Sequence, residues 1–370
     1  MIRRILNKTR VLPWLKQRMT TRRINQIRQI EEHQVISQYP SSCNSPLTNE
    51  EKRKVQDLWG QVVPVTSFKE FEMFKKMYGF DERFLTHHIY LPILARLLND
   101  YSYTKMFDDK GLLGYLGNPA IKFPKCYARF IEKDFYTNEM QQISRDEVIK
   151  LCANQDNLFI KPSKETSGGK GAELIHLSNL STNERISIVK KAINERNHSY
   201  VIQECLHQHP LMAQFNESSI NTFRITTLLL NGRFSVCSII IRFGRKGMKV
   251  DNWGAGGLMA SVNWRGDLSE KAYDIQLKEY TSVNNIVFKD FTIDFLPDIL
   301  KQIEYEHTNH FALCKFIGWD IAVNDQGEAV VLELNSSQPG VIGEQMISGP
   351  IFGNRTQEVI DYCKTKDFRF

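Results

Sequence analysis

The chain has 370 residues, of which 42% are hydrophobic and 24% are charged, an ordinary composition for a globular protein. This length suits one large domain or a few smaller ones, with a core that needs no disulfides or metals. The 7 cysteines lack the spacing of zinc ligands, which favours a reduced, cytoplasmic protein. The net charge of +6 is too small to indicate nucleic-acid binding. Two histidine pairs are unconvincing as metal sites: His207 with His209, and His307 with His310.

Positive charge is concentrated in a basic arm, residues 1–30. Lysines and arginines precede the first acidic residue, Glu31, and apolar residues are interleaved with them. This pattern is typical of an amphipathic helix that could lie on an anionic membrane, although Pro13 is expected to interrupt it. The favoured alternative is a helical arm packed on the protein itself. An Arg-rich start also resembles a mitochondrial transit peptide, whereas no stretch resembles a secretory signal or a bilayer span.

Residues 1–100 are predicted to be helical. A serine- and proline-rich loop is followed by Thr48, with Glu51 three residues later, a capping box that begins a helix. A second helix is predicted from Ser67, where aromatic residues recur at helical spacing and are most simply core. No candidate catalytic residue lies in this region.

From residue 104 onward the sequence predicts short strands and hairpins. Asn231-Gly232 joins two strand-like runs and is a strong hairpin signal. Further turns are predicted at 265–267 and 324–327, and a long helix between Pro297 and Cys314. The predicted strands are 158–161, 172–177, 200–204, 221–230, 233–242, 258–263, 268–273, 317–323 and 329–334. This order predicts an α+β fold with antiparallel sheets.

The stretch Phe159–Gly171 places Lys161 at the end of a predicted strand, followed by a loop of serine and glycine. Glycines let backbone N–H groups surround phosphate oxygens, and Lys161 could add positive charge. The loop is not a Walker A motif, because no serine or threonine follows Lys170, and a dinucleotide-binding fingerprint would open a helix. Here a second strand follows, so a flexible flap is expected. The alternative is a simple glycine-rich turn.

Three polar residues mark the last two predicted strands. Glu333 and Asn335 are two positions apart, so both point to the same face of their strand. With Asp320 facing them, they would form an oxygen site suited to Mg²⁺. The alternative is a carboxylate paired with one of the many basic residues.

The run Tyr200–Leu206 is a predicted strand that ends in a carboxylate, Glu204. Such a hinge could bond an adenine edge through its backbone, with Leu206 covering the ring. The alternative is an ordinary residue at the end of a strand.

In this order, the lysine, flap, hinge and acidic motifs resemble the ATP-grasp superfamily. More closely, the chain resembles the sugar-transfer-associated ATP-grasp proteins of bacterial polysaccharide gene clusters, over about residues 100–350. The matching motifs are Asp109-Lys110, Phe159–Pro162, Ser167–Gly171, Asn221–Ile225, Asp251-Asn252, Gly256-Gly257, Gly318–Asp320, Leu332–Asn335 and Pro339-Gly340.

The resemblance implies a role for each matching residue. ATP would be bound by Lys110, Lys161, Ser167, Gly168, Gly169, Gly171, Gln203, Glu204 and Leu206. Mg²⁺ would be bound by Asp320, Glu333 and Asn335. Arg224 would act with Lys161 as a catalytic residue at the γ-phosphate and the acceptor, although it could instead be a sheet-surface arginine paired with an acid. The acidic ribose ligand usual after the hinge is not evident, since His207–His209 stand there.

The acceptor-binding candidates are Asn221, Asn252, Gly256 and Gly257. Glycines permit close approach of a ligand, but the loop around Asn252 could equally be a plain loop. The predicted divisions are a helical region at 1–100, a first ATP-grasp subdomain at 101–206, and a second with the Mg²⁺ site at 207–370.

The resemblance implies that an acceptor carboxylate attacks the γ-phosphate of ATP and that an amine then displaces phosphate from the acyl phosphate. The protein would act in the cytoplasm, in the biosynthesis of cell-surface polysaccharides. A uronic acid or an amino acid would supply the carboxylate. The basic arm would bring the protein to the inner face of the membrane. The alternatives are a kinase on the same scaffold and a non-catalytic nucleotide-binding protein.

Overall fold

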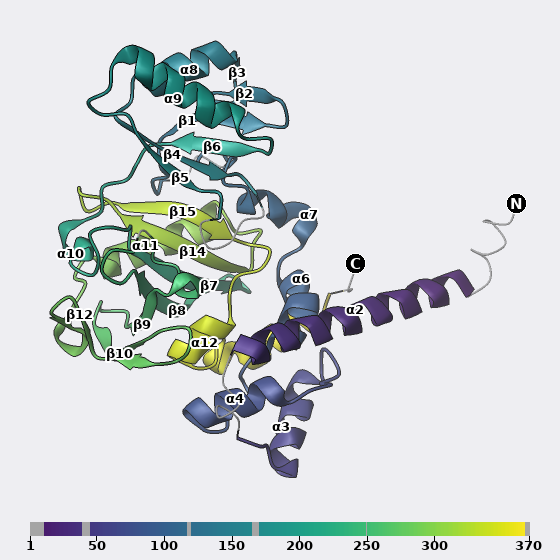
Figure 1. The fold of residues 1–370 in the computed structure, drawn as a ribbon. Coiled ribbons are helices and arrows are strands. Elements are labelled where there is room, and N and C mark those ends of the chain that lie inside the picture. The colour runs from purple at the N-terminus through teal and green to yellow at the C-terminus, as the bar shows by residue number, and fades with distance from the viewer. Residues whose placement is uncertain (1–10, 39–44, 117–119, 165–169, 249, 367–370) are drawn as a thin grey trace, which may run out of the picture. The chain divides into compact units, whose positions relative to one another are not determined.

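The computed structural model describes residues 11–38, 45–116, 120–164, 170–248 and 250–366 (Figure 1). It combines helices with antiparallel sheets, which confirms the predicted α+β class. The chain forms two compact units: unit 1 contains Met1–Asp100 and Gly340–Phe370, and unit 2 contains Tyr101–Pro339. The predicted division at residues 100 and 206 stays a prediction.

Unit 1 is built from helices. The capping box predicted at Thr48 and Glu51 is present at the start of the first short helix, and the helix predicted from Ser67 begins at Lys69. The helices of unit 1 are α2 Val11–Gln38, α3 Asn49–Trp59, α4 Lys69–Tyr78, α5 His87–Ile89, the π-helix Tyr90–Leu94, α6 Ala95–Leu98, α12 Ile342–Ser348, the 3-10 turn Gly353–Arg355 and α13 Thr356–Lys364.

Helix α2 runs from Val11 through Pro13 without a break, so the predicted interruption at Pro13 is wrong. Pro13 lies in the first turn, where backbone N–H groups have no partner within the helix, and a missing N–H is tolerated there. Arg28 of α2 is buried, and its guanidinium donates to the backbone oxygens of His88 at 3.0 Å and Pro64 at 2.8 Å. This part of the basic arm therefore packs on unit 1.

Unit 2 contains a six-stranded antiparallel sheet in the order β3-β2-β1-β6-β4-β5. In Figure 1, helices α8 and α9 lie against this sheet. Each helix begins with a serine capping box, and their apolar residues share one core with the strands. The elements are β1 Cys126–Ile131, β2 Asp134–Tyr136, β3 Gln142–Ile143, α8 Arg145–Ala153, β4 Asn157–Pro162, β5 Glu173–His176, α9 Thr182–Asn194 and β6 Tyr200–Gln203.

Unit 2 also contains a seven-stranded antiparallel sheet in the order β11-β10-β9-β8-β7-β14-β15. Its strands are β7 Thr222–Leu230, β8 Arg233–Phe243, β9 Leu258–Val262, β10 Leu268–Tyr273, β11 Glu279–Tyr280, β14 Phe316–Val323 and β15 Ala329–Asn335. The remaining elements are α7 Tyr101–Thr104, the 3-10 turn Lys105–Asp108, α10 Pro210–Ala213, the 3-10 turn Trp253–Ala255, the hairpin β12 Ser282–Val283 and β13 Ile286–Val287, the 3-10 turn Phe288–Asp290 and α11 Leu296–Asn309.

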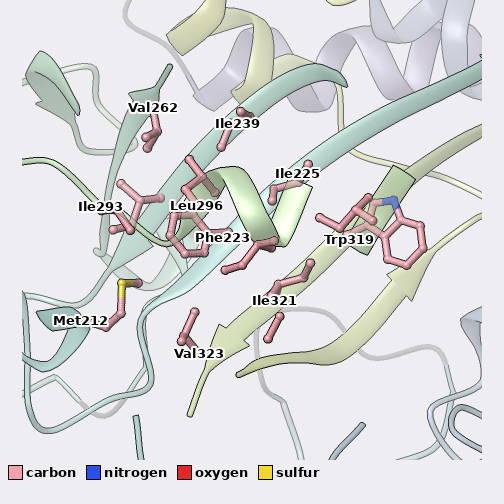
Figure 2. Close-up of a cluster of buried hydrophobic side chains, with 14 of the residues drawn as sticks. Met212, Phe223, Ile225, Ile239, Val262, Ile293, Leu296, Trp319, Ile321 and Val323 are labelled. Carbon is pink, nitrogen blue, oxygen red and sulfur yellow. The ribbon is translucent and has the colours of Figure 1, made fainter. Parts of the chain in front are cut away.

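The core of the seven-stranded sheet lies on one of its faces. Figure 2 shows Phe223 and Ile225 of β7 and Trp319 and Ile321 of β14 gathered with Leu296 of α11. Because side chains alternate along a strand, the residues between these apolar ones point to the opposite face. That opposite face is where charged side chains collect.

Among the described residues, no helix has both the length and the apolar character that crossing a bilayer requires.

Candidate functional site

Three neighbouring strands bring an arginine and two carboxylates into one row. Asp320 on β14 lies directly opposite Arg224 on β7 and directly opposite Glu333 on β15. Residues opposite each other in antiparallel strands share a face. Trp319 and Ile321, on either side of Asp320, point into the core, so the row lies on the face away from that core (Figure 2). This row is the centre of the candidate site.

Asp320 is buried and held by two arginines. Its Oδ1 accepts a hydrogen bond from Nε of Arg224 at 2.5 Å, and its Oδ2 accepts one from Nη2 of Arg224 at 3.1 Å. Nη2 of Arg242 lies 3.3 Å from the same Oδ2. Burial alone would raise the pKa of Asp320, but the two guanidinium groups outweigh burial and hold the pKa below its usual value. Asp320 is therefore ionised at neutral pH.

Arg242 is a site residue that the sequence reasoning missed. It lies on β8 opposite Thr222 of β7, and its Nε and Nη2 donate to Oγ1 of Thr222 at 3.1 and 2.9 Å. Thr222 in turn donates to Oδ2 of Asp251, which lies 3.8 Å from Nε of Arg242. The available signal was an arginine after the apolar run 239–241, because an arginine so placed needs acidic partners.

Charges therefore alternate across the face in the order Arg224, Asp320, Arg242 and Asp251. Burial raises the pKa of Asp251, while the Arg242 charge and the Thr222 hydrogen bond oppose that rise. Each guanidinium sits beside a carboxylate, so its orientation is fixed before any ligand binds. Such a preset pair of arginines suits recognition of an anionic group.

Two buried lysines complete the charged cluster beside β15. Nζ of Lys110 lies 2.7 Å from Oε1 of Glu333, and Nζ of Lys161 donates to the backbone oxygen of Leu332 at 3.1 Å. Burial lowers the pKa of Lys161 to about 8, and Lys110 adds to that shift, whereas Glu333 opposes it. An anion beside Lys161 would offset the cost of burying its charge.

Lys110 is positioned by a turn that is fastened to the end of β4. The backbone N–H of Lys110 donates to the oxygen of Ser163 at 2.9 Å. Oδ1 of Asp109 accepts from Oγ of Ser163 and from the N–H of Gly111. Lys110 and Lys161 are thereby held in a fixed relation to each other, although 50 residues separate them in the sequence.

The flap residues Ser167, Gly168 and Gly169 lie outside the described part of the chain. Gly171 is described and has φ of +76°, and a Cβ there would lie 2.9 Å from Cγ of Pro162. The end of the flap thus requires a glycine for its own conformation.

The hinge residues close the end of strand β6. Gln203 is buried and pairs with Phe159 of β4. Oε1 of Glu204 accepts from the backbone N–H of Lys125 at 2.7 Å, and the N–H of Glu204 donates to the oxygen of Lys125 at 2.9 Å. The carboxylate of Glu204 therefore fastens β6 to the segment before β1. Leu206 follows it and is half-buried.

Asn221 is fully buried and braces the segment ahead of β7. Its amide donates to Oε1 of Gln208 and to the backbone oxygens of Met212 and Asn216, at 2.9, 2.9 and 2.8 Å. Because its amide donors are all occupied, Asn221 could affect the binding of an acceptor substrate only by positioning neighbouring residues.

The glycine loop after Asp251 is a turn held by its own hydrogen bonds. Oδ1 of Asn252 accepts from the N–H of Ala255 at 3.2 Å, and Gly256 has φ of +102°. A Cβ on Gly257 would lie 2.3 Å from the backbone oxygen of Asp251. The glycines thus serve the turn itself, and the turn lies next to the carboxylate that borders Arg242.

The expected Mg²⁺ ligands differ in how well they suit a metal ion. In the described part of the chain, no cluster of three or more His, Cys, Asp or Glu side chains is arranged to hold one. Nδ2 of Asn335 donates to the oxygen of Gly318 at 3.3 Å, which leaves its carbonyl oxygen for a ligand. The Glu333 side chain is 27% exposed, with one oxygen on Lys110. Glu333 and Asn335 therefore suit Mg²⁺, whereas both oxygens of Asp320 are engaged by arginines.

The histidine pairs have other partners. Nδ1 of His209 accepts from the N–H of Leu211 at 3.2 Å and caps α10. His307 is buried, with Nδ1 2.8 Å from Oγ1 of Thr227 and Nε2 2.9 Å from the oxygen of Cys314. Burial lowers the pKa of His307 to about 4.

The family described as sugar-transfer associated ATP-grasp matches residues 93–361. No curated protein matches the sequence.

Several solved structures share the fold. D-alanyl-alanine synthetase A from Vibrio cholerae is 9% identical with a TM-score of 0.37, over 66% of this chain and 60% of that chain. VanG D-Ala:D-Ser ligase from Enterococcus faecalis is 14% identical with a TM-score of 0.40, over 70% of this chain and 60% of that chain. Biotin carboxylase from Campylobacter jejuni is 8% identical with a TM-score of 0.43, over 72% of this chain and 48% of that chain. The chain thus spans less than two thirds of the length of each, and the likeness concerns the fold alone.

Proposed function

Because the chain belongs to the sugar-transfer-associated ATP-grasp family, we propose that unit 2 binds Mg-ATP and uses it to activate an acceptor carboxylate. The carboxylate oxygen attacks the γ-phosphorus, the bond to the β,γ-bridging oxygen breaks, and ADP leaves. An amine then attacks the acyl carbon of the acyl phosphate and expels phosphate, with loss of a proton from nitrogen. The product is an amide.

The observation that carries this proposal is a cluster of buried and half-buried cations around one row of the sheet. Among the described residues, this cluster brings the cations Lys110, Lys161, Arg224 and Arg242 close to the carboxylates Asp251, Asp320 and Glu333. Phosphoryl transfer depends mainly on positioning and on neutralising phosphate oxygens. The phosphate oxygens of a nucleoside triphosphate are groups that such a cluster of cations can bind.

Each group of site residues has a separate proposed role, which follows from its position. Lys110 and Lys161 lie beside Glu333 and would bind phosphate oxygens, with the flap after Lys161 closing over them. Arg224, fixed by Asp320, would face the γ-phosphate and the acceptor carboxylate. Mg²⁺, when bound through Glu333 and Asn335, would neutralise phosphate charge. Gln203, Glu204 and Leu206 remain the proposed wall for adenine.

The family description supports a place in the transfer of sugars, and we assign the protein to cell-surface polysaccharide biosynthesis in the cytoplasm. A uronic acid or an amino acid would supply the carboxylate. The glycine turn at Asn252, Gly256 and Gly257 follows Asp251, which lies 3.8 Å from Arg242, and would form one wall of the acceptor site. The first residues of the basic arm would bring the protein to anionic lipid.

Thermal unfolding with and without Mg-ATP tests the nucleotide site. A ligand at 100 times its dissociation constant adds about 2.7 kcal/mol, which for a domain of this size raises Tm by roughly 5–10 °C. We expect this rise in the wild type and a much smaller rise in Lys161→Ala and Glu333→Gln. Lys191→Ala, an exposed lysine on α9, is the matched control and should behave as the wild type. No rise in the folded wild type would contradict the proposal.

Product analysis separates the ligase from its alternatives. Uronic acids and amino acids are screened for ADP release in the presence of hydroxylamine, which traps an acyl phosphate as a hydroxamate. Hydroxamate with free phosphate supports the ligase. A stable phosphorylated acceptor without free phosphate would identify a kinase, and ATP binding without ADP release from any acceptor would favour a nucleotide-binding protein.

A further inference from the structure

We propose that Asp320 is a positioning residue that fixes Arg224 and Arg242, and that Glu333 and Asn335 alone supply the protein ligands for the metal ion of the nucleotide. The inference rests on the proposed nucleotide site. It differs from the metal site that the sequence predicted, which included Asp320.

The contacts of Asp320 leave little room for a metal ion. Both carboxylate oxygens accept from Arg224, at 2.5 and 3.1 Å, and Oδ2 also lies 3.3 Å from Arg242. A carboxylate has about four lone-pair positions, and these contacts use three of them. A divalent cation on the fourth would sit beside a guanidinium group, and the two positive charges would repel each other in a site of low exposure.

The backbone explains why Asp320 belongs with the arginines. The register places Asp320 directly opposite Arg224, so the pair forms across two adjacent strands. Arg242 is then fixed from two sides, by Thr222 at 2.9 Å and by Asp320 at 3.3 Å. One carboxylate thus keeps two guanidinium groups apart and in place, which is what a substrate-binding pair of arginines needs.

Glu333 and Asn335 have what Asp320 lacks. The Glu333 side chain is 27% exposed, against 10% for Asp320. One oxygen of Glu333 contacts Lys110, and in the described part of the chain its other oxygen makes no hydrogen bond or ion pair. Asn335 donates its amide to Gly318 and keeps its carbonyl oxygen for a ligand. A Mg²⁺ ion that shares phosphate oxygens and keeps several waters needs only one or two such protein ligands.

The test uses Mn²⁺ as a paramagnetic stand-in and ADP as the nucleotide. ADP binding is measured by calorimetry, and Mn²⁺ binding to the protein–ADP complex by electron paramagnetic resonance. We expect Glu333→Gln to weaken Mn²⁺ binding by at least roughly tenfold, since loss of even an outer-shell partner has that effect. Asp320→Asn should weaken it clearly less than Glu333→Gln does, because the Asp320 side chain contacts the two arginines and neither Glu333 nor Asn335. Asp298→Asn, an exposed acid on α11, is the matched control.

A second variant guards against misfolding, because Asp320→Asn leaves two half-buried arginines with a weaker acceptor. The double variant Asp320→Asn with Arg242→Gln removes one negative and one positive charge together, and it should also keep Mn²⁺ binding. Loss of Mn²⁺ binding in folded Asp320→Asn or in the double variant, to the level of Glu333→Gln, overturns this inference and leaves the proposed function standing. Failure of the wild type to bind ADP at any Mn²⁺ concentration overturns the proposed function, and this inference with it.

Discussion

If Lys161 binds a phosphate group, as proposed, nucleotide binding depends on pH. Burial lowers the pKa of Lys161 to about 8, so the lysine loses its charge as the pH rises through that value. A phosphate group binds the protonated form better, and binding must therefore raise the pKa of Lys161 and weaken above pH 8. We expect the Kd for Mg-ADP to rise above pH 8, by at most about tenfold per pH unit.

The measurement is the Kd for Mg-ADP between pH 6.5 and 9.5 in wild type and in Lys161→Arg. An arginine stays charged throughout this range, so the variant should show a flat profile whatever its affinity. The same rise in both proteins would show that another group is responsible.

His307 makes the stability of unit 2 sensitive to acid. Its folded pKa of about 4 is below the usual value of 6.5, so the unfolded chain binds a proton that the folded protein excludes. Burial of the neutral His307 therefore contributes to the stability of the fold above pH 6.5, and this contribution is lost as the pH falls towards 4. Between pH 7 and 4.5 the loss is about 2.5 kcal/mol.

Urea unfolding of wild type and His307→Gln at both pH values isolates this contribution. The wild type should lose about 2.5 kcal/mol more of its unfolding free energy than the variant does, since glutamine cannot take up the proton. Equal losses in the two proteins would show that His307 is already accessible to protons in the fold.

The residues of the site were predictable to different degrees. Lys161, Glu333 and Asn335 follow from strand alternation and from a lysine before a glycine loop, and the structure places the three around β15. For Asp320, the sequence allowed either a metal ligand or a salt-bridged carboxylate, and the contacts with Arg224 support the second. Which alternative holds depends on long-range strand register, which a single sequence does not display.

Arg242 and Asp251 show the same limit from another side. The local sequence of neither residue shows its partner, which is Thr222, 20 residues from Arg242 and 29 residues from Asp251. A charge at the end of an apolar strand predicts that a partner exists. It does not predict which partner.

At the scale of elements, α11 holds the segment before β1 through one carboxylate. Oε1 of Glu306 accepts from the backbone N–H groups of Ala120 and Ile121, at 2.7 and 2.8 Å, and Oε2 lies 2.7 Å from Nδ1 of His310. Glu306 is buried, so Glu306→Ala leaves a buried donor at Ile121 without its partner. We expect a loss of about 1–3 kcal/mol of stability.

Glu304→Ala on the exposed face of the same helix is the matched control, and its stability should change by less than about 0.5 kcal/mol. Denaturant unfolding of the two variants beside the wild type gives both numbers. Equal effects of the two substitutions would mean that the contact with 120–121 contributes nothing to the fold.

Elements with strong local signals were predicted well. Asn231 and Gly232 have φ of +53° and +72°, and the turn joins β7 to β8 as the sequence indicates. The helix predicted between Pro297 and Cys314 is α11, which ends earlier, at Asn309. Strands β1, β2 and β3 were not predicted. The last two have only 3 and 2 residues, too few for any periodicity to show.

At the scale of the whole chain, the basic arm has two parts. Arg28 is buried against unit 1, so removing residues 1–30 would also remove a structural contact. A truncated variant that begins at Arg22 lacks residues 1–21 and keeps the contact made by Arg28. We expect the intact protein, and not the truncated one, to sediment with anionic vesicles at low salt, because basic side chains each add about 1 kcal/mol to binding such a surface.

Vesicles of neutral lipid are the control and should bind neither protein. The Tm of the truncated protein should equal that of the intact one, which shows that unit 1 is undisturbed. Equal binding of both proteins to anionic vesicles would contradict a membrane role for residues 1–21.

Unit 1 is assembled from two stretches of chain, with all of unit 2 between them: Met1–Asp100 precede it and Gly340–Phe370 follow it. On a ribosome the residues emerge in order, and domains generally fold as units when their last residue is available. Unit 2 is complete once Pro339 has emerged, whereas unit 1 still lacks α12 and α13. The side-chain amide of Gln345 donates to the backbone oxygen of Leu85 and accepts from its N–H. Gln345 can make these bonds only after unit 2 has emerged. During synthesis, the helices of the first hundred residues are therefore not yet covered by α12 and α13 while unit 2 folds, and we expect a chaperone that shields apolar surface to act on this protein in that interval.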